Sequence, residues 1–174
     1  MKKKIILLIS GKGTNAINIT NYFQNKNSPI FENIKKYDAS AEFFNLRDFD
    51  NIIFEKIKKI NPDLIVLAGF LKKISLKYIN FFSKKIINIH PSLLPKYGCK
   101  GMYGMHIHKK VIDSNDKETG ITIHFVSQEY DSGEIIFQKK ITVNKGDNAS
   151  LIEKKVHNLE YEYYPKIIAS LLDI

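Results

Sequence analysis

Short runs of consecutive apolar residues, separated by stretches of mixed polarity, mark the first half of the chain. They are Ile5–Ile9, Leu64–Ala68 and Ile86–Ile89. Because apolar and polar residues do not alternate in these runs, they predict strands that are covered on both faces, as in a parallel sheet. The segments that carry apolar residues at helical spacing are 15–23, 52–60 and 76–82. Strands that alternate with helices in this way predict a doubly wound α/β domain.

The second half of the chain has a different pattern. Residues 120–125 alternate between apolar and polar, and residues 134–143 form a second extended run. The segment Asp131-Ser-Gly133 between them is typical of a turn. We therefore expect a mostly parallel, twisted sheet with an antiparallel part toward the C-terminus.

A long final helix is predicted by the apolar residues at helical spacing between Leu151 and Tyr163. Asp147 or Asn148 is suited to cap its first turn, and Pro165 is expected to kink or close it. The stretch 25–41, by contrast, has mixed polarity and no clear period.

Length and composition narrow the class of protein. With 174 residues, 44% of them hydrophobic and 26% charged, the chain is expected to form one globular domain, 1–174, with a sizeable core. No stretch approaches the roughly 18 consecutive apolar residues of a membrane span. The first ten residues are basic and then apolar but lack a signal-peptide cleavage site, so we interpret them as leading into a buried strand. The single Cys99 cannot form an internal disulfide, which predicts a cytoplasmic protein.

The chain is basic, with 27 Lys and Arg against 18 Asp and Glu and a net charge of +9. Such a charge favours anionic partners, among them nucleic acid, phosphorylated metabolites and polyglutamates. Most of the lysines are scattered singly or in pairs, as on an ordinary solvated surface. The charge by itself therefore does not choose between these partners.

Residues 10–15, Ser-Gly-Lys-Gly-Thr-Asn, are the first candidate site, a glycine-bearing turn between the first strand and the first helix. Unpaired backbone N–H groups at the start of a helix, with glycines that allow a close approach, suit a phosphate group. The spacing matches neither the dinucleotide fingerprint nor the longer NTP-binding loop. A plain tight turn is an equally good interpretation of these residues.

Asn88 and His90 are the second candidate site. Because they are two residues apart on a strand, their side chains share one face. Pro91 ends the strand at the carboxyl edge of the sheet, where open α/β sheets bind ligands. An amide donor beside an imidazole suits the stabilisation of an oxyanion and the transfer of a proton. A carboxylate next to His90 would favour the protonated ring, and Asp131 is a candidate for it, although aspartates in such turns usually brace the backbone.

Other groups of residues carry weaker signals. His106, His108 and His124, even together with His90, have no carboxylate or cysteine cluster at metal-binding spacing, so no metal site is predicted. We expect these three histidines to cap helices or to support other residues. No Gly-x-Ser-x-Gly nucleophile elbow occurs, and Cys99 has no local feature that would activate its thiol.

Five stretches of the chain together resemble the glycinamide ribonucleotide formyltransferases, a folate-dependent family of purine synthesis. They are SGKGTN (10–15), PDLIVLAGF (62–70), NIHPSLLPKY (88–97), HFVSQEYDSG (124–133) and LEYEYYP (159–165). The stretches follow the order of the family and span most of the chain. The motif Asn88-x-His90-Pro-Ser-Leu-Leu-Pro95 is specific to folate formyltransferases, and Asp131 falls where the family has its active-site aspartate.

The resemblance implies direct transfer of a formyl group from 10-formyltetrahydrofolate to the amine of glycinamide ribonucleotide, with no metal and no covalent enzyme intermediate. Asn88 and protonated His90 would meet the oxyanion of the tetrahedral intermediate, while Asp131 would orient His90 and help to relay the proton. The resemblance also implies a nucleotide- and phosphate-binding half, 1–90, and a folate-binding half with the C-terminal helix, 91–174.

The resemblance further implies which residues bind the two small-molecule substrates. Those for the nucleotide are Gly13, Thr14, Asn15, Pro91 and Glu160. Those for the folate are Leu71, Lys72, Lys73, Ile74, Asn88, Ser127, Gln128, Glu129, Tyr130 and Asp131. Arg47 roughly matches a basic residue near the folate tail, with a spacing that differs by one. We expect neither a nucleic acid nor a membrane as partner, and a monomer or homodimer.

One departure from the family and two rival functions stay open. Between the first helix and the strand-like residues 41–45 the family has a further strand, and its loss would leave the sheet one strand shorter than usual and expose an edge. Methionyl-tRNA formyltransferase has a similar catalytic domain and would suit the basic charge, but it carries a further C-terminal barrel domain. A non-catalytic RNA- or folate-binding remnant of the fold would suit the shortened region, whereas the joint presence of Asn88, His90 and Asp131 argues against it.

Overall fold

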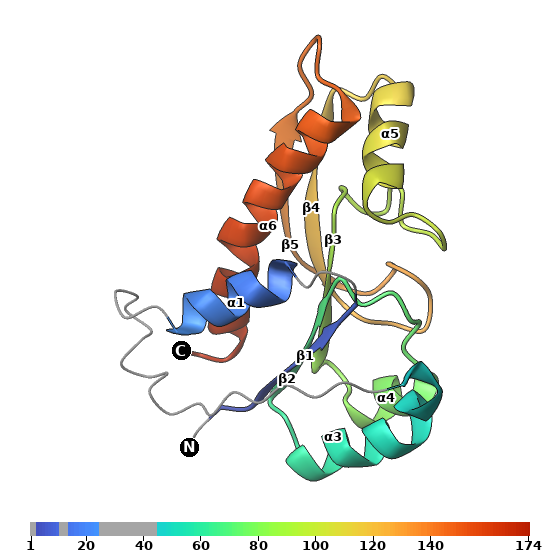
Figure 1. Cartoon of the computed structure of the whole chain (residues 1–174), viewed down its shortest axis with the longest axis vertical. Coiled ribbons are helices and arrows are strands. Elements are labelled where there is room, and N and C mark those ends of the chain that lie inside the picture. The colour runs from blue at the N-terminus through green and yellow to red at the C-terminus, as the bar shows by residue number, and fades with distance from the viewer. Residues whose placement is uncertain (1–2, 11–13, 25–44) are drawn as a thin grey trace.

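The computed structural model describes residues 3–10, 14–24 and 45–174. In these residues five strands form one mixed sheet in the order β1-β2-β3-β4-β5 (Figure 1). The strands are β1 (Ile5–Ile9), β2 (Leu64–Ala68), β3 (Ile86–His90), β4 (Glu118–Phe125) and β5 (Ile135–Thr142). β1, β2 and β3 run parallel, whereas β4 and β5 are antiparallel to their neighbours. The predicted fold class is confirmed; the region 25–41, on which the expectation of a lost strand depends, lies outside the described residues.

Helices cover both faces of the sheet. They are α1 (Thr14–Gln24), α3 (Phe54–Ile60), α4 (Leu76–Phe81), α5 (Met105–Asp113) and α6 (Ala149–Leu171), with two short helical turns, η1 (Leu46–Asp48) and η2 (Phe49–Ile53), ahead of α3. α1 and α6 pack on one face, and α3 and α4 on the other (Figure 1). Because both faces are covered, β2 is buried along its whole length, as its unbroken apolar run predicts. The same prediction is wrong for β1, which pairs only with β2 among the described strands: only Leu8 is buried there and Ile9 is exposed.

The pairing of β3 with β4 brings polar side chains to one edge of the sheet. In this register Asn88 lies opposite His124, and His90 lies opposite Thr122. Because side chains alternate along a strand, these four residues share one face of the sheet. The residues between them pack into the core with α1 and α6; they are Ile87, Ile89, Ile121 and Ile123. Apolar packing on one face thus fixes the polar residues on the other.

α6 begins as predicted but does not end at its proline. The Asn148 side chain accepts a hydrogen bond from Leu151 N at 2.9 Å and caps the first turn. The helix then continues through Pro165, so the expectation that Pro165 closes it is wrong. Proline lacks the N–H that would bond the carbonyl four residues earlier. Nδ2 of Asn18, on α1, donates to that carbonyl, Tyr161 O, at 2.9 Å instead.

Candidate active site

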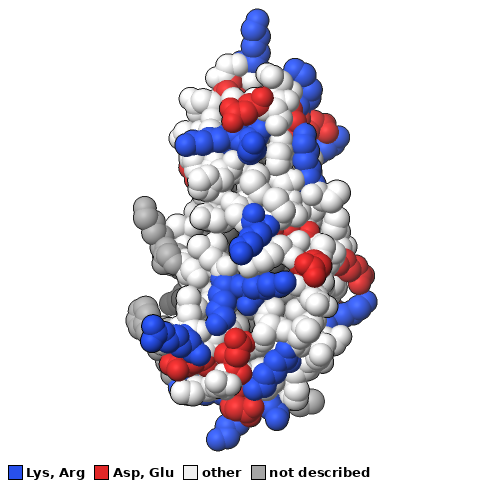
Figure 2. Space-filling view, turned by 90° about the vertical axis from the view of Figure 1, so that its right-hand side faces the viewer, with Lys and Arg blue, Asp and Glu red and all other residues white. Residues whose placement is uncertain are grey.

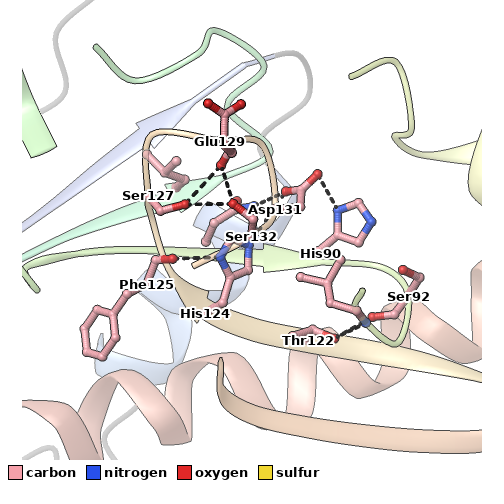
Figure 3. A network of polar contacts seen from close by, with 12 residues as sticks. His90, Ser92, Thr122, His124, Phe125, Ser127, Glu129, Asp131 and Ser132 are labelled. Atoms are coloured by element: carbon pink, nitrogen blue, oxygen red, sulfur yellow. Dashed lines mark hydrogen bonds and ion pairs between the residues drawn. The ribbon is translucent and has the colours of Figure 1, made fainter. Parts of the chain in front are cut away.

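Asn88 and His90 both belong to β3. The loop that follows β4 brings Asp131 next to His90 (Figure 3). Nδ1 of His90 lies 3.4 Å from Oδ2 of Asp131. Nδ2 of Asn88 donates to Oδ1 of the same carboxylate, also at 3.4 Å. The amide, the imidazole and the carboxylate that the sequence suggested therefore meet at one point.

A second imidazole, that of His124, also reaches Asp131. Its Nε2 lies 3.7 Å from Oδ1 of Asp131 and 3.3 Å from Nδ2 of Asn88, while its Nδ1 donates to Phe125 O at 2.8 Å. A bulge in the pairing of β4 with β5 falls directly before His124, and such bulges often re-aim side chains beside active sites. From the sequence, this residue is not predicted to belong to the site and is expected only to cap a helix or to support other residues. The available signal was its position on the polar side of the alternating strand 120–125, shortly before Asp131.

The two imidazoles hold the carboxyl of Asp131 in its ionised form. Burial alone would raise its pKa, since only 13% of the side chain is exposed. Hydrogen bonds and charge from His124 and His90 outweigh burial and place the pKa of Asp131 well below its usual range. At neutral pH the site therefore keeps a carboxylate against a buried imidazole, that of His90.

Hydrogen bonds within the loop after β4 hold Asp131 in place. The hydroxyls of Ser127 and Ser132 lie 3.0 Å apart, and both donate to Glu129 O, at 3.2 and 3.3 Å (Figure 3). Asp131 itself has a φ of 49°, in the left-handed region. Aspartate enters this region more easily than most residues, which suits it to this position in the turn.

A cleft opens beside these residues, between the loop after β2 and the loop after β4. It is lined by most of the residues predicted to bind folate: Leu71, Lys72, Lys73, Ile74, Asn88, Ser127, Glu129, Tyr130 and Asp131. Its other walls are Leu67, Phe70, His124 and Val126. Gln128 and Arg47, which were predicted with this group, are exposed and are not among the lining residues.

Both walls of the cleft contribute to a cation–π contact. Nζ of Lys73, on the loop after β2, lies 5.3 Å from the centre of the Tyr130 ring, on the loop after β4. Lys72 also lines the cleft, but its Nζ is directed to the backbone of η1, where it donates to Leu46 O at 2.7 Å. Figure 2 looks onto this side of the molecule, where basic side chains lie in the middle of the face with acidic ones beside them. Positive charge is therefore available beside the cleft.

A second group of polar side chains lies between the start of α1 and α6. Nδ2 of Asn15 donates to Oε2 of Glu160 at 3.0 Å, and Nδ1 of His157 lies 2.7 Å from the same oxygen. The hydrogen bond that His157 donates to Glu160 raises the pKa of His157, whereas burial lowers the pKa of the nearby His108. Oδ1 of Asn15 and Nδ1 of His108 are buried without a hydrogen-bond partner in the part of the chain that the structure describes. We refer to these four residues as the α1–α6 cluster.

Comparison with known proteins extends the match along most of the chain. The family model described as formyl transferase matches residues 20–168. The phosphoribosylglycinamide formyltransferase of Escherichia coli (strain K12) is 32% identical, over 97% of this chain and 87% of its own length. That of Haemophilus influenzae is 34% identical, over 95% of this chain and 85% of its own length. The chain belongs to the phosphoribosylglycinamide formyltransferase family.

Solved structures of phosphoribosylglycinamide formyltransferases have the same fold. The glycinamide ribonucleotide transformylase 1 of Geobacillus kaustophilus superposes with a TM-score of 0.81 at 26% identity, covering 99% of this chain and 100% of that one. The phosphoribosylglycinamide formyltransferase of Anaplasma phagocytophilum superposes with a TM-score of 0.81 at 26% identity, covering 99% of this chain and 89% of that one. The mixed sheet described above is therefore the fold of this family.

The residues predicted to bind the nucleotide are only partly brought together. Asn15 and Glu160 are hydrogen-bonded to each other in the α1–α6 cluster. Thr14 is the exposed first residue of α1, and Pro91 directly follows β3. Gly13 lies outside the described residues. The roles of all five in this formyltransferase stay predictions.

Two further observations concern metals and membranes. Among residues 3–10, 14–24 and 45–174, no three His, Cys, Asp or Glu side chains are grouped so that they could hold a metal ion. None of the helices in those ranges has the length and apolar character of a membrane span. Cys99 is exposed and unpaired.

Proposed function

We propose that this chain transfers the formyl group of 10-formyltetrahydrofolate to the amine of glycinamide ribonucleotide, giving formylglycinamide ribonucleotide and tetrahydrofolate in purine synthesis. The observation that carries the proposal is the convergence of Asn88, His90 and Asp131: Asn88 and Asp131 line the cleft, and His90 lies buried behind Asp131. Membership of the phosphoribosylglycinamide formyltransferase family supports it.

The N–H donors of Asn88 and protonated His90 point into one small region. Both donate toward Asp131 across 3.4 Å, which is longer than the about 2.7–2.9 Å of a charge-assisted N–H···O bond. An incoming oxygen can therefore share these donors. When the amine attacks the formyl carbon, negative charge develops on the formyl oxygen, and the two donors stabilise it.

Asp131 supports the reaction as a carboxylate. Because its pKa lies well below its usual range, it stays ionised and orients the His90 ring through the contact with Nδ1. In the reaction the attacking amine loses a proton, the C–N bond to the folate breaks, and the folate nitrogen gains a proton. Asp131 accepts a hydrogen bond from the amine and guides this proton, through water where the two nitrogens are apart.

The two substrates occupy different parts of the molecule in this proposal. The folate lies in the cleft, and the nucleotide lies at the α1–α6 cluster, where the start of a helix favours a phosphate. Residues 1–90 then supply the phosphate end and residues 91–174 most of the folate contacts. Glu160 of the second half joins Asn15 of the first at the nucleotide. We propose a cytoplasmic monomer or homodimer, in keeping with the unpaired Cys99.

A spectrophotometric assay with 10-formyltetrahydrofolate and glycinamide ribonucleotide tests the proposal. Wild type is expected to turn over, whereas His90→Ala is expected to lose about 10²–10⁴-fold in rate, the usual contribution of a proton-transfer group. His106→Ala, at an exposed position of α5, is the matched control and is expected to keep the wild-type rate. Folate binding without turnover above the level of His90→Ala would indicate a binding module instead. Formylation of methionyl-tRNA in place of the nucleotide would indicate the rival substrate.

A further inference from the structure

The two ring nitrogens of His90 face acceptors of different origin. Nδ1 faces Oδ2 of Asp131 at 3.4 Å, and Nε2, which points away from Asp131 (Figure 3), lies 3.0 Å from the backbone oxygen of Tyr97. A carboxylate and a carbonyl can only accept, so both contacts are hydrogen bonds only when both nitrogens carry protons. The carbonyl of Tyr97 therefore fixes the orientation of the ring that the proposed reaction uses.

Tyr97 presents this carbonyl from an unusual backbone conformation. Its φ of 63° lies in the left-handed region, which residues with a bulky side chain rarely enter. The side chain is anchored outside the cleft, because its hydroxyl donates to Oδ2 of Asp116 at 2.9 Å. Lys96 holds the other oxygen of Asp116 at 2.5 Å, and Lys96 O accepts from the Ser92 hydroxyl at 2.7 Å. The conformation of Tyr97 is thus fixed from both sides.

Gly98, the next residue, lies directly against Asp131. A Cβ atom built on Gly98 would be 3.3 Å from both Cβ and the backbone oxygen of Asp131, and 2.6 Å from Cδ2 of Leu94. The absence of a side chain at Gly98 lets the backbone come this close. Consecutive residues therefore lie beside the two members of the catalytic pair: the carbonyl of Tyr97 contacts His90, and Gly98 leaves little room for a side chain beside Asp131.

We propose that Tyr97 and Gly98 are positioning residues for the His90–Asp131 pair, and that Asp116 secures them from outside the cleft. The kinetic consequence of this inference rests on the proposed formyl transfer, whereas the geometry of the His90 ring does not. Neither residue needs to touch a substrate. Their effect is therefore expected in kcat rather than in KM.

Two substitutions test the two contacts separately. Tyr97→Phe removes the hydroxyl that bonds Asp116, and we expect kcat to fall about tenfold with both KM values unchanged. Gly98→Ala removes the space beside Asp131, and we expect a loss of about 100-fold, since small misplacements of catalytic groups have effects of this size. Tyr103→Phe removes the hydroxyl of an exposed tyrosine nearby and is the matched control. It is expected to keep the wild-type kcat.

The ring-nitrogen resonances of His90, measured by NMR on labelled protein, supply a readout that does not depend on turnover. The Nε2 resonance is expected to shift in Tyr97→Phe and Gly98→Ala, and to stay at its wild-type position in Tyr103→Phe. Shifts of this kind in a protein without turnover would contradict the proposed function but support the positioning role. If wild type turns over and folded Tyr97→Phe keeps both its kcat and its His90 resonances, the inference is overturned. Tyr97→Phe also decides the matter if Gly98→Ala does not fold.

Discussion

The proposed catalytic cleft and the α1–α6 cluster both contain buried polar side chains, among them His90 and His124 in the first and Asn15 and Glu160 in the second, but they differ in how many of their polar atoms are hydrogen-bonded. In the cleft, every catalytic side chain is hydrogen-bonded to another side chain or to the backbone. In the cluster, Oδ1 of Asn15 and Nδ1 of His108 are buried and find no partner among the described residues. Within the described residues, the polar side chains of the cleft are paired with one another, whereas two buried polar atoms of the cluster have no partner.

This difference points to two ways of using substrate binding. A buried polar group without a partner costs about 1–3 kcal/mol, and a ligand that supplies the partner removes that cost. Catalytic dipoles that are already in place need no reorganisation at the moment of reaction. Substitutions in the cleft should therefore lower kcat, whereas substitutions in the α1–α6 cluster should raise the KM of the nucleotide.

The largest expected effect on the cluster side is that of Glu160→Gln. The change keeps the shape but removes the charge that Asn15 and His157 contact. A hydrogen bond to a charged group contributes about 1.5–3 kcal/mol, so we expect the KM for glycinamide ribonucleotide to rise about 10–100-fold. Steady-state kinetics measures it, with Glu162→Gln, at an exposed position of the same helix, as control. A fall in kcat at unchanged KM would contradict the expectation that the cluster acts in nucleotide binding and the cleft in the chemical step.

Acid unfolding should reveal the ionised carboxylate of the cleft. Because the pKa of Asp131 is lowered in the folded protein, its contribution to stability is complete above the ordinary pKa of aspartate and is lost as the pH falls through the lower folded value. The free energy of unfolding, measured with urea over a pH series, should fall by about 1–3 kcal/mol more in wild type than in Asp131→Asn between about pH 5 and pH 2. Asp113→Asn, at an exposed position, should follow wild type. Identical curves for wild type and Asp131→Asn would argue against the lowered pKa.

His124 tests whether the cleft depends on its second imidazole. His124→Ala removes the neighbour of Asn88 and Asp131, and we expect kcat to fall about tenfold, the effect of one hydrogen bond in a buried network. His124→Gln restores an N–H donor and should recover part of the rate. A wild-type kcat in His124→Ala would mean that the site does not need this residue.

The smallest expected effect is a pH-dependent contribution of the α1–α6 cluster to the stability of the fold. The pKa of His157 is raised by Glu160, so the stabilisation is present below the ordinary pKa of histidine and is lost as the pH rises through the folded value. Because 41% of the His157 side chain is exposed, solvent screening limits the effect to at most about 1 kcal/mol. The melting temperatures of wild type and His157→Gln, measured between about pH 6 and pH 8, should differ at the acidic end and become equal at the alkaline end. A constant difference across that range would exclude the charged pair as its cause.

The sequence predicts the positions of the strands well because short apolar runs leave a local signal, and the length of the runs at β1 and β2 favours strands over helices. It predicts burial less well: β2 is buried along its whole length, whereas only one residue of β1 is buried, because burial depends on what packs against the strand. Pro165 shows the limit of local reasoning. Its effect on α6 depends on Asn18, a residue of another helix, which satisfies the carbonyl that the proline leaves free.

A site residue can be predicted from the sequence when it lies with another site residue on one strand or in one motif. Asn88 and His90 share a strand face, which the spacing indicates. The position of His124 beside Asn88 was not predicted, because it depends on the β3–β4 register. Tyr97 was not predicted either, because its contact with His90 is made by a backbone carbonyl, which does not depend on residue type. Contacts made by backbone atoms cannot be predicted from the chemistry of the side chains.

The central claim is that formyl transfer depends on a carboxylate already paired with His90, and the kcat of Asp131→Asn at saturating concentrations of both substrates tests it most directly. The substitution keeps the size of the side chain and removes the charge. We predict a kcat about 10²–10⁴-fold below wild type with both KM values changed less than about threefold. A kcat close to that of wild type would contradict the claim.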